Sequence, residues 1–197
     1  MPYCDKKQVI FLHVPKTGGT TIKRLFEINL LDNPDPAIRP SLQHLTCSLL
    51  RQQIGDDKYD RYYKFAFVRN PWARLVSDYF WRQQLPKIRP VLPFPEFVNN
   101  AQKLVLENRY YEQEFGDHFI PQICYTTDVN DVFRFENFKE DVLKVAAKLG
   151  VEIDPILPKE PKPHDRYWEF YDDKTRSIIH KIYAEEIEQF GFEFEVC

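Results

Sequence analysis

The segment PKTGGTT, residues 15–21, contains the residue types that hold a phosphate-like anion. It follows a short apolar run and precedes a helical pattern, so a lysine and two glycines lie where a strand turns into a helix. Backbone N–H groups at a helix N-terminus carry partial positive charge and bind anions. We expect the N–H groups from Thr17 to Thr21 to form an oxyanion cradle. The alternative is a tight turn with a solvated lysine.

The order of residues in this loop differs from that of a nucleotide kinase. A Walker A loop places the lysine and a magnesium-binding hydroxyl after its last glycine. Here Lys16 precedes Gly18 and Gly19, and no Gly-Lys-Ser/Thr sequence occurs in the chain. The four cysteines are far apart and have no close cysteine or histidine neighbours of the kind that zinc sites use. We therefore expect no metal, and we rank a kinase or related phosphotransferase as the alternative.

A second anion site is predicted in FVRNPWARLVSDYF, residues 67–80. Arg69 ends an apolar strand, and Ser77 follows on a predicted helix, about 10 Å further along its axis. A guanidinium that folds back over the helix could share a phosphate with this hydroxyl, with help from Arg74. The alternative makes Arg69 a surface ion-pair partner and Ser77 an incidental polar residue.

The elements that must position these residues repeat one order, a strand followed by a turn and a helix. Alternating strands and helices predict an α/β fold with a parallel sheet covered on both faces. We predict that Thr20 or Thr21 caps the first helix, that Asn70 with Pro71 starts the second, and that Asn137 starts the third. The predicted strands cover residues 8–14, 64–68 and 131–137, and the predicted helices start near residue 20 and cover 46–54, 71–84, 95–113, 138–150 and 172–192.

Composition limits the classes of partner. The chain has 197 residues, 43% of them hydrophobic, which suits one domain with a sizeable core. A formal net charge of -3 argues against a general nucleic-acid or membrane-surface binder. We see no signal peptide and no apolar stretch long enough for a membrane span, so we expect a soluble, cytoplasmic protein with reduced thiols.

Both motifs resemble those of a known family. PKTGGTT resembles the 5′-phosphosulfate-binding loop, and FVRNPWARLVSDYF the 3′-phosphate-binding segment, of sulfotransferases that use 3′-phosphoadenosine 5′-phosphosulfate (PAPS). The carbohydrate branch, which includes heparan sulfate 2-O- and chondroitin sulfotransferases, is the most similar. DHFIPQ and RFENFKEDV also resemble later family segments, less specifically. The resemblance implies one P-loop-like, three-layer domain over residues 1–197, PAPS as donor, adenosine 3′,5′-bisphosphate (PAP) as product, and a carbohydrate hydroxyl as acceptor.

The resemblance also implies roles for single residues. Lys16 would stabilise the bridging oxygen of the phosphosulfate as that oxygen leaves, while Arg69 and Ser77 would take the 3′-phosphate. Arg166 and Tyr167 lie where family members place a loop over the nucleotide, although Tyr167 is equally consistent with core packing. The residues expected to bind PAPS are Pro15, Lys16, Thr17, Gly18, Gly19, Thr20, Thr21, Arg69, Ser77, Arg166 and Tyr167.

The acceptor hydroxyl must lose a proton, and histidine is the usual group to take it. His44 precedes a predicted helix, where the resembling family often carries a catalytic histidine, so it is the first candidate for the base. His118 in DHFIPQ is the competitor, as base or acceptor ligand, against the alternative of a solvent-exposed structural histidine. His13 suits a packing or orienting role. A further alternative is an inactive module that only binds the nucleotide.

Overall fold

The structure is a computed structural model that describes residues 2–28, 41–85, 92–153 and 166–195. Contacts divide the chain into two compact units. We name Met1–Val68 with Gln122–Glu160 the sheet unit, and Arg69–Pro121 with Pro161–Cys197 the helical unit. The prediction of a single domain stays a prediction. Of the helices in the described ranges, none has the length and apolar character needed to cross a membrane.

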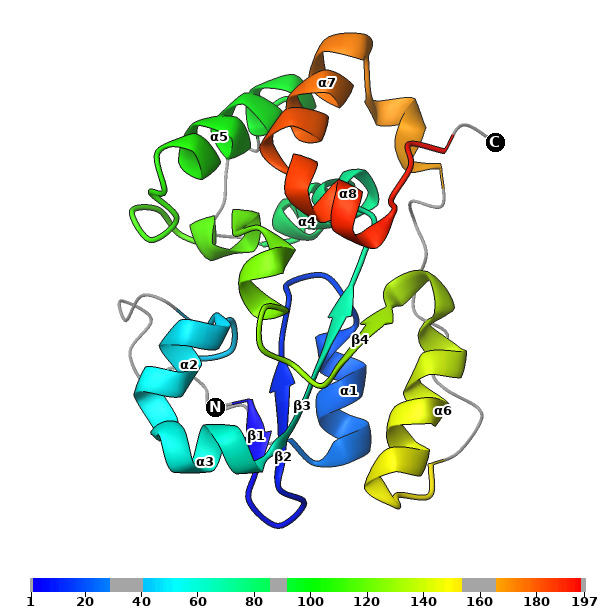
Figure 1. Cartoon of the computed structure of the whole chain (residues 1–197). Coiled ribbons are helices and arrows are strands. Elements are labelled where there is room, and N and C mark those ends of the chain that lie inside the picture. The colour runs from blue at the N-terminus through cyan, green and yellow to red at the C-terminus, as the bar shows by residue number, and fades with distance from the viewer. Residues whose placement is uncertain (1, 29–40, 86–91, 154–165, 196–197) are drawn as a thin grey trace. The chain divides into compact units, whose positions relative to one another are not determined.

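The sheet unit contains a four-stranded sheet (Figure 1). The central and outer strands β2, β3 and β4 are parallel, as predicted, and Phe11 of β2 lies opposite Phe65 of β3. Two residues at the N-terminus form an antiparallel edge strand that the sequence did not predict. In sheet order, the strands are β1 (Tyr3–Cys4), β2 (Val9–Leu12), β3 (Tyr63–Val68) and β4 (Asp131–Arg134).

Helices cover the sheet from both sides, which confirms the predicted α/β class. Side chains alternate between the faces of each strand, so Val9, Phe11 and Phe65 share one face. This face packs against α1 (Gly19–Phe26) and α6 (Phe138–Leu149), whose Ile22 and Val142 are fully buried. Figure 1 shows α2 (Cys47–Ile54) and α3 (Asp56–Arg61) on the other side.

The helix ends of the sheet unit differ from the prediction at one important place. Helix α1 begins at Gly19, and its N-cap is Gly18 in the left-handed conformation, so the predicted caps Thr20 and Thr21 are wrong. Both threonines already lie inside the helix. Gly150 ends α6 with a φ of 62°, as predicted, because glycine adopts this conformation without a steric penalty.

The helical unit is built around α4 (Pro71–Gln83), whose predicted start is confirmed. The side chain of Asn70 accepts hydrogen bonds from the backbone N–H groups of Trp72 at 3.1 Å and Ala73 at 3.3 Å, and Pro71 occupies the first turn. The other elements are α5 (Phe94–Leu106), η1 (Gly116–Phe119), η4 (Tyr167–Phe170), α7 (Asp173–Ile182) and α8 (Ala184–Phe190).

The final predicted helix, residues 172–192, is two helices, α7 and α8. Tyr183 interrupts them with a φ of −119°. Its ring is buried, and its hydroxyl donates to the carbonyl of Phe119 at 2.8 Å. This contact with a distant part of the helical unit accompanies the break, which explains why a local pattern of isoleucines predicted one continuous helix.

Candidate active site

The loop after β2 has an unusual backbone that is held from within. Lys16 has a φ of 69°, a left-handed conformation that is uncommon for a residue with a side chain. Such strain is concentrated at functional sites. Thr17 is fully buried, and its hydroxyl donates to the carbonyl of Val14 at 2.8 Å. Its side chain therefore fixes the loop, while its backbone N–H belongs to the predicted cradle.

Both loop glycines are required by the packing of aromatic rings. A Cβ atom on Gly19 would overlap the imidazole of His13. Gly18 has a φ of 80°, and a Cβ atom there would lie 2.5 Å from the ring of Phe138. We predicted that these glycines allow a ligand to approach the backbone. The structure adds a second reason, which is that two rings of the sheet unit lie against the turn.

The start of α1 fits an anion. The N-cap, Gly18, has no side chain with which to cap the first turn, and that turn contains no acidic residue. The basic residues Lys23 and Arg24 lie in the last turn, where the helix dipole is negative. The positive end of the dipole is therefore not neutralised by a carboxylate of its own first turn, and the donor set of this loop suits a phosphosulfate.

His44, the first candidate for the base, lies beside this loop within the sheet unit. Its ring is edge-on to the ring of His13, with centroids 4.8 Å apart. Since the ring of His13 lies against Gly19, the two imidazole rings lie between the start of α1 and the segment that precedes α2. The backbone of His44 is held by Ser41, which accepts from its N–H at 2.9 Å, and by Tyr125, whose hydroxyl donates to its carbonyl at 3.1 Å.

The second predicted anion site lies in the helical unit. Arg69 precedes the N-cap of α4, and Ser77 lies in the second turn of that helix; both side chains are half-buried. Arg74 is buried and donates to the carbonyls of His118 at 2.8 Å and Ile120 at 3.4 Å. Its guanidinium therefore holds the protein's own backbone, a contact that the suggested help with a phosphate did not anticipate.

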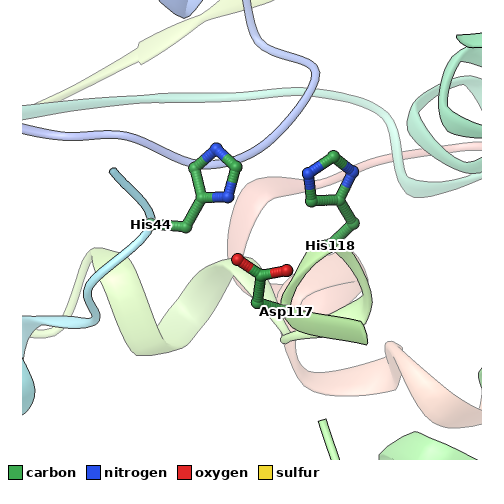
Figure 2. Close-up of side chains that lie close together, drawn as sticks. All are labelled: His44, Asp117 and His118. Carbon is green, nitrogen blue, oxygen red and sulfur yellow. The ribbon is translucent and has the colours of Figure 1, made fainter. Parts of the chain in front are cut away.

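His118 is buried, so the alternative of a solvent-exposed histidine is wrong. Figure 2 shows His118 and Asp117 extending from the same short helix, η1, and His44 from the segment ahead of α2. The Nδ1 atom of His118 lies 2.5 Å from Oδ1 of Asp78, and Oδ2 of Asp78 accepts from Nε of Arg82 at 2.8 Å. A histidine paired with a carboxylate is a common arrangement for a general base.

Asp78 is the functional candidate that sequence reasoning missed. Burial by itself raises the pKa of this carboxyl, but the charges of His118 and Arg82 and their hydrogen bonds hold the pKa below its usual range. A signal was present in the sequence. Arg74, Asp78 and Arg82 recur every four residues and therefore share one face of α4.

The two residues predicted to cover the nucleotide have partners within the helical unit. Arg166 is exposed and lies 3.1 Å from the carboxylate of Glu169. Tyr167 is buried, its hydroxyl accepts from the N–H of Glu195 at 2.9 Å, and its ring contacts that of Phe194. These contacts favour the core-packing alternative for Tyr167. The preceding part of the predicted loop, residues 155–165, lies outside the described residues.

The cysteines that the structure describes, Cys4, Cys47 and Cys124, form no disulfide. Cys47 is buried at the start of α2, and the other two are half-buried.

Comparison with known proteins identifies the family. A sequence model described as "Sulfotransferase family" matches residues 1–193. An uncharacterized protein of Archaeoglobus fulgidus is 33% identical over 104 residues, which cover 52% of this chain and 80% of that protein. Carbohydrate sulfotransferase 10 of Xenopus laevis is 22% identical over 232 residues, covering 97% of this chain and 63% of the relative.

Carbohydrate sulfotransferase 12 of Xenopus laevis is 25% identical over 186 residues, which cover 83% of this chain and 39% of the relative. The matches thus span less than two thirds of the length of both carbohydrate sulfotransferases. No solved structure matches the chain. The match along 193 residues nevertheless covers both predicted anion-binding segments, and the chain belongs to the Sulfotransferase family.

Proposed function

We propose that this protein transfers a sulfuryl group from PAPS to a hydroxyl group of an acceptor. The observation that carries the proposal is the loop with Lys16 before Gly18 and Gly19, at the start of a helix whose first turn has no acidic residue. Membership of the Sulfotransferase family supports it. PAPS supplies the activated sulfuryl group when bound, and the residues of this chain bind it and handle charge and protons.

The loop would hold the 5′ end of the donor. Its backbone N–H groups from Thr17 to Thr20 would bind the phosphosulfate, whereas the N–H of Thr21 donates to the carbonyl of Gly18 at 3.0 Å. Lys16 would stabilise the negative charge that develops on the bridging oxygen. A sulfuryl group carries less charge than a phosphoryl group. One lysine with backbone donors can therefore do the work that kinases assign to metal ions.

Arg69 and Ser77 would take the 3′-phosphate, the group that separates PAPS from ATP. A guanidinium binds phosphate with paired, charge-assisted hydrogen bonds, so it can discriminate between the two nucleotides. Support for this role comes from the position of Arg69 directly before the N-cap of α4 and of Ser77 in the second turn of that helix. The resemblance of the segment to the 3′-phosphate-binding segment of the family also supports it.

The acceptor is proposed to be a carbohydrate hydroxyl, because two of the relatives are named carbohydrate sulfotransferases. A histidine would take the hydroxyl proton. His44 is a candidate because its ring lies beside His13 at the phosphosulfate loop. His118 is the other candidate because a carboxylate orients its ring.

Calorimetry with two nucleotides tests the donor. We expect PAP to bind at least tenfold more tightly than adenosine 5′-monophosphate, because only PAP carries the 3′-phosphate. Equal affinity for the two nucleotides would contradict the proposal. Turnover of ATP that depends on added magnesium would favour the phosphotransferase alternative.

A further inference from the structure

We infer that Asp78 is a positioning residue for sulfuryl transfer, which holds His118 so that Nε2 of its ring accepts the proton of the acceptor hydroxyl. The inference rests on the proposed function, since it identifies the base of that reaction. All the contacts that carry it lie within the helical unit.

The tautomer of His118 follows from its contact with Asp78. The distance from Nδ1 to Oδ1 is 2.5 Å, and His118 and Asp78 are 6% and 2% exposed. An ionised carboxylate only accepts hydrogen bonds, so Nδ1 must carry the hydrogen that it donates to Asp78. In the neutral imidazole, Nε2 then carries the lone pair.

The carboxylate of Asp78 is itself fixed. Arg82 donates from Nε to Oδ2 of Asp78 at 2.8 Å and from a terminal nitrogen to the carbonyl of Phe115 at 2.6 Å. Phe115 is the N-cap of η1, which carries His118. One arginine therefore ties the carboxylate to the start of the short helix that holds the histidine.

The backbone after His118 is held by the other arginine of α4. Arg74 donates to the carbonyls of His118 at 2.8 Å and Ile120 at 3.4 Å. Its guanidinium lies 4.0 Å from the buried carboxylate of Glu186 on α8. The charged groups around His118 in the helical unit are thus Asp78, Arg74 and Arg82 of α4, Glu186 of α8, and the neighbouring buried Asp117 of η1.

Aromatic rings fix the plane of the imidazole. The ring of Trp81 lies 5.0 Å from that of His118 at an interplanar angle of 30°, and the ring of Phe115 lies 5.7 Å away. The contact with Asp78 and these two rings therefore fix the position and the plane of the His118 imidazole. Such preorganisation is what a group that receives a proton at one defined atom requires.

A purely structural role explains this network less well. Burying charged groups costs desolvation, and apolar residues of similar size are often at least as stabilising. Arg74, Asp78 and Arg82 nevertheless occupy one buried face of α4 at intervals of four residues. The two arginines hold the backbone on either side of His118, and Asp78 holds its ring. The network converges on the histidine.

The chemical step balances with His118 as the base. The acceptor oxygen forms a bond to sulfur while the bond from sulfur to the bridging oxygen breaks, and that electron pair stays on the 5′-phosphate of the PAP product. The hydroxyl proton moves to Nε2 of His118. The resulting imidazolium is stabilised by the carboxylate of Asp78 through Nδ1–H, so Asp78 need not exchange a proton.

Nitrogen NMR of the full chain tests the geometry without any acceptor. The chain is labelled with ¹⁵N-histidine and saturated with PAP, and the ring signals of His118 are identified by their loss in His118→Gln. We expect wild type at pH 8 to carry its proton on Nδ1 of His118. A wild-type ring protonated only on Nε2 would overturn the inference.

Kinetics test the role in transfer, with ³⁵S-labelled PAPS and unsulfated chondroitin oligosaccharides. We expect Asp78→Asn to lower kcat/KM by about 10- to 100-fold, as residues that orient a functional group do. The acid limb of its pH profile should move to lower pH, because the imidazolium loses its carboxylate partner. Asp78→Glu should recover part of the rate. The matched control is Asp141→Asn on α6, another buried carboxylate, which should leave the limb in place.

Two results separate failure of the inference from failure of the proposed function. If wild type transfers sulfate but the acid limb of the pH profile is the same in Asp78→Asn, the inference alone is overturned. The same holds if His44→Gln abolishes the acid limb of the pH profile while His118→Gln keeps it. Failure of wild type to sulfate any acceptor would contradict the proposed function, and the role of Asp78 with it.

Discussion

The imidazole of His13 occupies the space that a side chain at Gly19 would need. Because Gly19 is the first residue of α1, this contact joins the end of β2 to the start of the helix that is proposed to hold the phosphosulfate. His13 also stacks on Phe11 of β2, with ring centroids 5.2 Å apart. The turn is therefore fixed from the sheet side by a ring.

Substitution of Gly19 tests this contact. We expect Gly19→Ala to lower the free energy of unfolding by about 1–3 kcal/mol, the usual cost of overpacking a buried site. In the background of His13→Ala the same change should cost much less, because the overlapping ring is gone. Urea unfolding of the four chains of this double-mutant cycle measures the coupling. A cost of Gly19→Ala that is unaffected by His13→Ala would contradict the contact.

Removal of Arg69 tests the proposed 3′-phosphate site. We expect Arg69→Ala to weaken binding of PAP by about 10- to 150-fold, the equivalent of roughly 1.5–3 kcal/mol for hydrogen bonds to a charged group. Binding of adenosine 5′-monophosphate should change far less. Titration calorimetry measures both, with Arg61→Ala, an exposed arginine of α3, as the control. Equal affinity of wild type and Arg69→Ala for PAP would refute the assignment.

Removal of Lys16 separates leaving-group stabilisation from binding. We expect Lys16→Ala to lower kcat by about 100- to 1,000-fold, the loss typical of a group that stabilises charge in the transition state. The affinity for PAP should fall less than kcat. Lys103→Ala, an exposed lysine of α5, is the control and should behave as wild type. A variant that loses affinity but keeps kcat would place Lys16 in ground-state binding only.

Acid should remove the stabilisation that Asp78 provides. Although burial raises the pKa of this carboxyl, the charges of His118 and Arg82 hold its folded pKa below the unfolded value of about 3.9. Its ionised form thus contributes stability above that unfolded pKa, and the contribution is lost as pH falls through the lower, folded pKa.

The comparison of wild type with Asp78→Asn measures this contribution. At pH 7 the variant should be less stable by roughly 3–5 kcal/mol, since it leaves a buried arginine without its carboxylate. The difference should shrink when unfolding is repeated below pH 4. Gln84→Ala, at the exposed C-cap of α4, should show the same small difference at every pH. A gap for Asp78→Asn that is constant from pH 7 to pH 3 would contradict the account.

The sequence predicted the parts of the fold that depend on local patterns. Asn70 followed by Pro71 predicted the start of α4, and Gly150 predicted the end of α6, because caps depend on residues within one turn. The three parallel strands were also predicted; β2 and β3 are largely apolar runs, whereas β4 has the apolar pair Val132 and Phe133 between two charged residues. The edge strand Tyr3–Cys4 was not, because two residues give no periodic pattern and pair only in the presence of β2.

Features that depend on distant contacts could not be predicted in this way. The carboxylate that binds His118 belongs to Asp78, which is 40 residues away in the sequence. The local pattern of α4 indicated only its apolar face. Gly18, and not Thr20 or Thr21, is the N-cap of α1, and the ring of Phe138 that lies against Gly18 comes from a distant part of the sequence. The sequence alone predicted the residue types of the anion-binding loop. The network that orients His118 could be seen only in the structure.

Transfer of labelled sulfate tests the central claim most directly. The full chain is incubated with ³⁵S-labelled PAPS and a panel of hydroxylated carbohydrates, and labelled product and PAP are both measured. We predict that wild type releases one PAP for each labelled acceptor and that Lys16→Ala loses nearly all of this activity. Binding of PAP without label transfer to any acceptor, or phosphate transfer from ATP with magnesium, would contradict the account.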